Sequence, residues 1–135
     1  MNRRSRLRHI APTGLAALFI GSGTLHLVRP EFFAAAVPGV LPEPGAIIFT
    51  SGIAELVCAA GLLSGARWAG QISAILLVAV FPGNVWMAVT TSADPNASTL
   101  ARLAVWARLP LQIPLIWAAL QSRTPARAPR AKGGR

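Results

Sequence analysis

Residues 46–64 read AIIFTSGIAELVCAAGLLS, an apolar stretch in which Glu55 is the only charged side chain. Because an α-helix rises about 1.5 Å per residue, about 20 such residues cross the roughly 30 Å hydrocarbon layer of a bilayer. A charge at mid-bilayer costs about 2.5–3.5 kcal/mol unless it is paired or reaches water. The stretch therefore predicts a transmembrane helix whose one carboxylate faces the protein interior.

Three more apolar segments of similar length, residues 10–28, 68–90 and 100–120, predict an all-α bundle of four transmembrane helices. The composition agrees, because 53% of the chain is hydrophobic, 13% is charged and the mean hydropathy is +0.53. So few charges exclude a soluble domain, and so much apolar surface excludes an intrinsically disordered chain.

The connections between these segments are short or rich in proline. Residues 29–45 contain four prolines, which forbid a continuous helix, whereas Phe32 and Phe33 keep the segment apolar. We expect an interfacial loop that lies on the bundle. Residues 64–67 predict a tight turn, and residues 91–99 predict a polar loop.

The basic residues gather at the two ends of the chain. There are 13 Lys and Arg against 4 Asp and Glu, the net charge is +9, and most basic residues lie in residues 1–9 and 121–135. Basic tails around an apolar body are typical of a membrane protein rather than of a nucleic-acid binder. Because Lys and Arg are retained on the cytoplasmic side, we expect both basic tails to lie in the cytoplasm. Arg3 and Arg4 also resemble an export signal, but the small residues 34–36 lie too far away for a cleavage site, which favours an uncleaved first helix.

Seven polar side chains interrupt the predicted spans: His26, Glu55, Gln71, Asn84, Arg102, Arg108 and Gln112. With the amino terminus in the cytoplasm, Gln71 and Arg102 fall at opposite edges of the membrane. The other five predict one ligand-binding pocket that opens outward: Glu55, Arg108, Gln112, Asn84 and His26. Glu55 is the deepest of them, and Arg108 is its expected counter-charge.

Prolines and small residues refine the predicted bundle. Three prolines inside the spans each remove a backbone donor, and Pro82 thereby frees the carbonyl of Val78 for another partner. Small residues mark faces where helices approach closely in lipid, and Ala17 with Gly21 predicts such a face on the first helix.

Glu55 and Arg108 allow two interpretations. They form either a structural ion pair that fixes the helix register or a site for a ligand or a proton. The spans hold no second carboxylate for acid and base catalysis, and His26 with Glu55 is too small a ligand set for a metal. The single Cys58 cannot form a disulfide or a redox pair within the chain. We therefore expect neither a conventional enzyme nor a metal site.

Four motifs follow one another along the chain: His26 with Pro30 and Phe33; Ser51-Gly52 with Glu55; Phe81-Pro82-Gly83-Asn84 with Met87; and Arg108-Leu109-Pro110-Leu111-Gln112 with Trp117-Ala118. With these motifs the chain resembles the DoxX-like family of small bacterial membrane proteins from about residue 14 to residue 120. The resemblance implies four helices in the cytoplasmic membrane. Through relatives associated with thiosulfate:quinone oxidoreduction and oxidative-stress complexes, it also implies a link to redox chemistry. The lone Cys58 departs from any scheme that uses a cysteine pair.

These patterns favour an accessory, redox-associated membrane protein without catalytic activity, whose pocket binds a small polar or quinone-like headgroup. The alternative is a scaffold subunit of a larger membrane redox complex, for which Phe32 and Phe33 would supply contacts. A third hypothesis is a proton-coupled transporter, which four helices support only as a homo-oligomer. We expect the lipid bilayer and such membrane assemblies as partners, and no nucleic acid.

Overall fold

The computed structural model describes residues 3–122, which form four long helices and a short one. In chain order these are α1 (Arg3–Val28), the 3₁₀ helix η1 (Pro30–Ala36), α2 (Pro44–Leu63), α3 (Ala69–Ala93) and α4 (Thr99–Gln121). Four segments are long and apolar enough to cross a membrane: Ile10–Val28, Pro44–Leu63, Ala69–Ala93 and Thr99–Gln121. The predicted all-α bundle of a multi-pass membrane protein is therefore confirmed.

The two helix ends that flank the connection between α3 and α4 differ from the predicted boundaries, and local hydrogen bonds form at both. α3 runs past residue 90, and the hydroxyl of Ser92 donates to the carbonyl of Ala88 at 2.7 Å, which satisfies this polar group inside the helix. α4 begins at residue 99 because Oγ of Ser98 accepts a hydrogen bond from the N–H of Ala101 at 3.1 Å. Such a cap stabilises the first turn of a helix.

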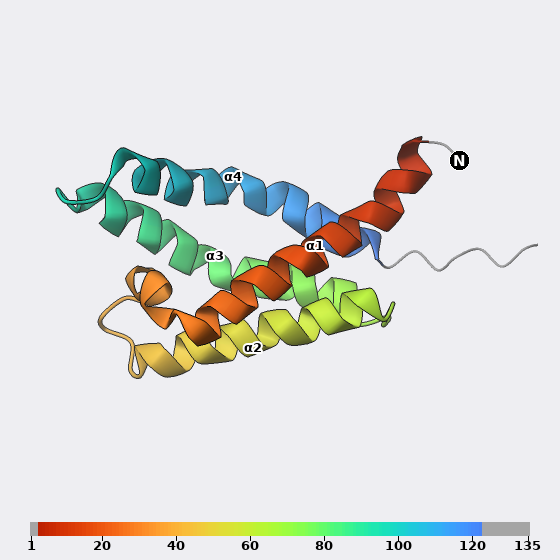
Figure 1. The fold of residues 1–135 in the computed structure, drawn as a ribbon, viewed down its shortest axis with the longest axis horizontal. Coiled ribbons are helices and arrows are strands. Elements are labelled where there is room, and N and C mark those ends of the chain that lie inside the picture. The colour runs from red at the N-terminus through yellow and green to blue at the C-terminus, as the bar shows by residue number, and fades with distance from the viewer. Residues whose placement is uncertain (1–2, 123–135) are drawn as a thin grey trace, which may run out of the picture.

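The long helices run alternately in opposite directions (Figure 1). The start of α1 and the end of α4 consequently lie at one end of the molecule, and η1 lies at the other. α1 begins at Arg3, so residues 3–9 of the predicted amino-terminal tail are helical. Most of the predicted carboxy-terminal tail, residues 123–135, lies outside the described residues.

The helices form two pairs, because α1 packs mainly on α2 and α3 packs mainly on α4. The pairs meet in a hydrophobic core: Leu15, Ala16, Phe19, Cys58, Ala59, Leu62, Ala69, Leu77, Ala118 and Ala119. Toward η1 the two pairs diverge (Figure 1), and η1 packs on α1, α2 and α3. Residues 29–45, predicted as a loop on the bundle, thus contain a short helix that lies on three of the long ones.

α1 and α2 cross where Gly23 faces Gly52. A Cβ atom at Gly52 would lie 2.7 Å from Cβ of His26 and 3.0 Å from the carbonyl oxygen of Gly23. Ala17 and Gly21 are exposed instead, and a Cβ at Gly21 would meet nothing within 4 Å. The predicted contact face at Ala17 and Gly21 is therefore wrong. Because two residues turn a helix by about 200°, Gly21 and Gly23 point to opposite sides.

The predicted turn at residues 64–67 is confirmed as a Schellman motif. The N–H of Ala66 donates to the carbonyl of Gly61 at 2.9 Å, and the N–H of Gly65 donates to that of Leu62 at 3.3 Å. Gly65 has a φ of +69°, a conformation that strains any residue with a side chain.

Gly65→Ala is expected to lower the free energy of unfolding by about 1 kcal/mol, because in the left-handed region the Cβ of alanine lies too close to the following carbonyl oxygen. The measurement is the Tm of the detergent-solubilised protein. Gly45→Ala is the matched control, since a Cβ there meets nothing within 4 Å. Equal Tm values for the two variants would contradict the motif.

Candidate functional site

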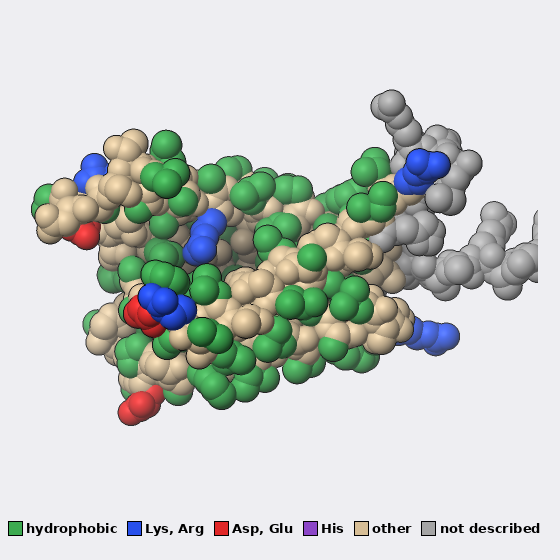
Figure 2. Space-filling view, in the orientation of Figure 1, with side chains coloured by type: hydrophobic (Ala, Val, Ile, Leu, Met, Phe, Trp, Pro, Cys, Tyr) green, Lys and Arg blue, Asp and Glu red, His purple; other side chains and the backbone are tan. Residues whose placement is uncertain are grey.

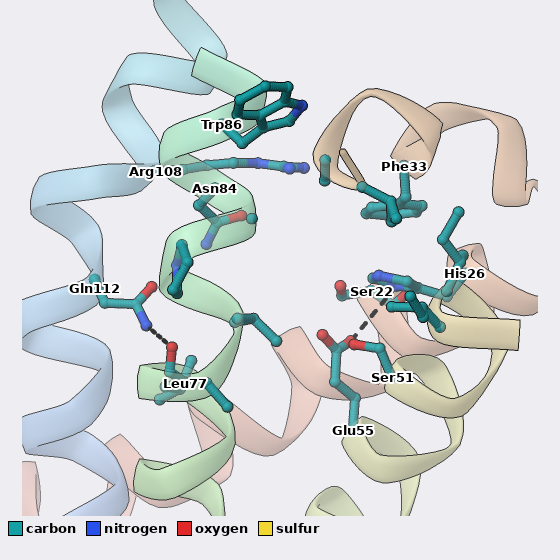
Figure 3. Close-up of a pocket in the computed structure, with 18 of the residues that line it drawn as sticks. Ser22, His26, Phe33, Ser51, Glu55, Leu77, Asn84, Trp86, Arg108 and Gln112 are labelled. Atoms are coloured by element: carbon teal, nitrogen blue, oxygen red, sulfur yellow. Dashed lines mark hydrogen bonds and ion pairs between the residues drawn. The ribbon is translucent and has the colours of Figure 1, made fainter. Parts of the chain in front are cut away.

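A cavity of about 650 Å³ lies between the α1/α2 pair and the α3/α4 pair, next to η1 (Figure 3). All five predicted ligand-binding residues line it: His26 of α1, Glu55 of α2, Asn84 of α3, and Arg108 and Gln112 of α4. Neither Gln71 nor Arg102 does. Most of the remaining lining is apolar, and an apolar wall with a few polar groups is typical of ligand sites.

His26 and Glu55 are the two titratable groups on the α1/α2 wall. Nδ1 of His26 lies 2.8 Å from the carbonyl oxygen of Ser22 and 3.8 Å from Oε2 of Glu55. Because a carbonyl can only accept, Nδ1 carries a hydrogen and donates it to Ser22. The close crossing at Gly23 and Gly52 is what brings His26 beside Glu55.

The carboxylate of Glu55 is buried and incompletely satisfied. Glu55 is 7% exposed, and its Oε2 has no hydrogen-bond partner within residues 3–122. Its side chain points from α2 toward the centre of the cavity (Figure 3). An unpartnered oxygen in apolar surroundings is costly, and a donor from a ligand would remove that cost.

Gln112 and Asn84 belong to the opposite wall. The side-chain amide of Gln112 donates to the carbonyl of Leu77 (Figure 3). Pro82 was predicted to free the carbonyl of Val78 for another partner. The carbonyl that accepts from the Gln112 side chain is instead that of Leu77, one residue earlier, and Leu77 is buried while Val78 is exposed. The side-chain amide of Asn84 lines the cavity and makes no hydrogen bond within the described residues, so it can bind a ligand.

The predicted ion pair between Glu55 and Arg108 is wrong. Within residues 3–122 the ion pairs closer than 4 Å are His26–Glu55 and Arg29–Glu31. Nη1 of Arg108 instead lies 3.6 Å from the sulfur of Met87. Glu55 and Arg108 occupy facing walls of the cavity (Figure 3), and the helix crossing gives Glu55 a nearer partner in His26.

Sequence reasoning missed three aromatic residues of the cavity, Phe19, Phe33 and Trp86. Phe33 of η1 stacks on His26 with ring centroids 3.5 Å apart and an interplanar angle of 17°. The guanidinium carbon of Arg108 lies 5.9 Å from the centre of the same ring. The motif that joins Phe33 to His26 and Pro30 was the available signal that Phe33 belongs to the site. The sequence alone does not give the direction in which η1 folds back, because that direction depends on tertiary packing.

Beside the cavity, Arg29 and its neighbours form a separate exposed cluster. The Arg29 guanidinium donates to the Glu31 carboxylate and thereby holds the pKa of Glu31 below its usual value. It also lies 5.0 Å from the centre of the exposed Phe32 ring. Within the described part of the chain, no three His, Cys, Asp or Glu side chains lie together in a way that could hold a metal ion.

One known family matches the part of the chain that contains the cavity. The family described as "Domain of unknown function (DUF8561)" matches residues 15–123. The chain belongs to this family. Every residue that lines the cavity lies within the DUF8561 match. No curated protein and no solved structure matches the chain.

Proposed function

We propose that this DUF8561 protein is an accessory, redox-associated protein of the bacterial inner membrane whose cavity binds a small polar or quinone-like headgroup. One observation carries the proposal: a buried carboxylate with an incomplete set of hydrogen bonds and a guanidinium without an ion-pair partner face each other across an apolar cavity. Glu55 has a buried oxygen without a hydrogen-bond partner, and Arg108 has no acidic side chain within 4 Å among residues 3–122. Such groups are costly in a membrane unless a ligand completes them.

A flat ring with an oxygen at each end suits this arrangement. Arg108 and Asn84 would donate hydrogen bonds to one oxygen, and the carboxyl group of Glu55 would share a hydrogen bond with the other. Phe33 lines the cavity and stacks on His26, so the edge of its ring would contact the ring of the ligand. A quinol would donate a hydrogen bond to Oε2 of Glu55, and a quinone would accept one from the protonated carboxyl group, whereas an isolated inorganic anion would bind Arg108 and offer Oε2 no hydrogen.

Membership of the DoxX-like type and the cytoplasmic position of the termini belong to the same proposal. Each of the four motifs contributes at least one residue to the cavity: His26 and Phe33, Glu55, Asn84, and Arg108 with Gln112. The basic residues at the chain ends favour cytoplasmic termini. In that orientation η1 and the cavity lie toward the outer side of the membrane.

Arg108→Gln is expected to weaken headgroup binding at least about tenfold, because charged hydrogen bonds to a ligand contribute about 1.5–3 kcal/mol. The measurement is the rise in Tm of the detergent-solubilised protein as a short-chain benzoquinone is titrated. Arg67→Gln is the matched control, because Arg67 is exposed and does not line the cavity. The absence of any Tm rise with benzoquinones or small organic anions well above micromolar concentration would overturn the proposed function.

A scaffold subunit is the second candidate, favoured by the exposed faces at Ala17, Gly21 and Phe32. Phe33, expected to share that role, is buried and lines the cavity instead. Affinity purification from membranes separates the two candidates. A stoichiometric partner that survives Glu55→Gln and is lost with Gly21→Leu would favour the scaffold.

A further inference from the structure

The cavity is open on its side between α1 and α4. Leu18 of α1 and Leu111 of α4 both line it, and 48% and 54% of these residues are exposed. η1 closes another side of the cavity, where it packs on α1, α2 and α3. Figure 2 shows the molecular surface hollowed between α4 and α1. We call this opening, flanked by Leu18 and Leu111, the α1/α4 portal.

The portal lies at the middle of the membrane spans. The span Ile10–Val28 has its midpoint at residue 19, next to Leu18. The span Thr99–Gln121 has its midpoint at residue 110, next to Leu111. Acyl chains rather than water surround a protein at this depth. A molecule that uses the portal is therefore dissolved in the bilayer.

Polar and apolar groups are separated within the cavity in the way that an amphiphile requires. Glu55, with its unpartnered oxygen, is buried, whereas leucines flank the portal. Arg108 is exposed and lies one turn before Gln112, beside the portal residue Leu111. A head that carries hydrogen-bonding groups would leave its apolar chain in contact with the leucines.

We propose that the ligand is a chain-bearing amphiphile that enters sideways from the bilayer. Its head lies between Glu55 and Arg108, and its alkyl or isoprenoid chain leaves through the α1/α4 portal into the lipid. This inference rests on the proposed headgroup site and adds the class of ligand and its route. The apolar chain contributes to binding because it partitions the ligand into the bilayer and so concentrates it at the depth of the portal.

The test uses the full chain in lipid nanodiscs and two benzoquinones with the same ring, one with a decyl chain that ends in a photoreactive diazirine and one without a chain. We expect the decyl probe, after irradiation, to label peptides around Leu18 and Leu111. Arg108→Gln should reduce this labelling to the background level that probe dissolved in the lipid gives at exposed side chains. Labelling of Ile75, which is exposed on α3 and lies outside the cavity, should be unchanged and reports probe dissolved in the lipid.

A portal variant, Leu18→Trp with Leu111→Trp, completes the test, and Leu111→Trp alone serves if the double variant does not fold. We expect it to weaken decyl-probe binding at least about tenfold and to leave the chainless ring unaffected. Ile113→Trp is the control, since Ile113 is 74% exposed and does not line the cavity. Equal binding of both probes and no effect of the portal variant would overturn this inference alone. A failure of both probes to raise the Tm would overturn the headgroup site and this inference with it.

Discussion

Gly52→Ala is expected to destabilise the protein, although alanine favours a helix by about 1 kcal/mol over glycine. A Cβ at this position would lie 2.7 Å from Cβ of His26, 3.0 Å from the carbonyl oxygen of Gly23 and 3.3 Å from Cδ2 of Leu27. Two of these atoms cannot move without their helix, so α1 must shift away from α2. Overpacking of this kind costs about 1–3 kcal/mol, and we expect the Tm in detergent to fall by about 5 °C.

Gly21→Ala is the matched control on the neighbouring helix. Its Cβ meets nothing within 4 Å, so the gain in helix propensity should leave the Tm unchanged or raise it. Gly52→Ala should also weaken headgroup binding, because it moves His26 away from Glu55. A Tm change of the same sign in both variants would contradict the α1–α2 crossing described above.

The four spans and the shared cavity could be predicted because lipid imposes strict constraints. A spanning chain must satisfy its backbone internally, so long apolar segments become helices whose lengths match the bilayer. Depth along each helix then limits which polar side chains can meet. This reasoning brought Glu55, Asn84, Arg108 and Gln112 to one pocket, together with His26.

The rotation of each helix about its axis could not be predicted in the same way. Apolar residues lie on all sides of each spanning helix, so hydropathy does not distinguish the face that meets a neighbouring helix from the face that meets lipid. The small residues Ala17 and Gly21 were the predicted contact face of the first helix, whereas packing selected Gly23 against Gly52. That selection decided the partner of Glu55.

Glu55→Leu is expected to raise the Tm and abolish headgroup binding. Leucine has a similar volume and removes a buried oxygen that has no hydrogen-bond partner within residues 3–122. His26 keeps its hydrogen bond to the Ser22 carbonyl, so the substitution leaves no new unpaired donor at Nδ1. Removing a buried polar atom that lacks a hydrogen bond recovers its desolvation cost of about 1–3 kcal/mol.

Glu55→Gln separates the two effects of the leucine variant, because it keeps the shape and the hydrogen-bonding capacity and removes the charge. We expect a smaller rise in Tm and a partial loss of binding, measured by the same titration with a short-chain benzoquinone. Breaking a structural ion pair has the opposite sign, since it destabilises a protein by about 3–5 kcal/mol. A fall of that size in Glu55→Leu would therefore make Glu55 a structural partner of His26 rather than part of a ligand site.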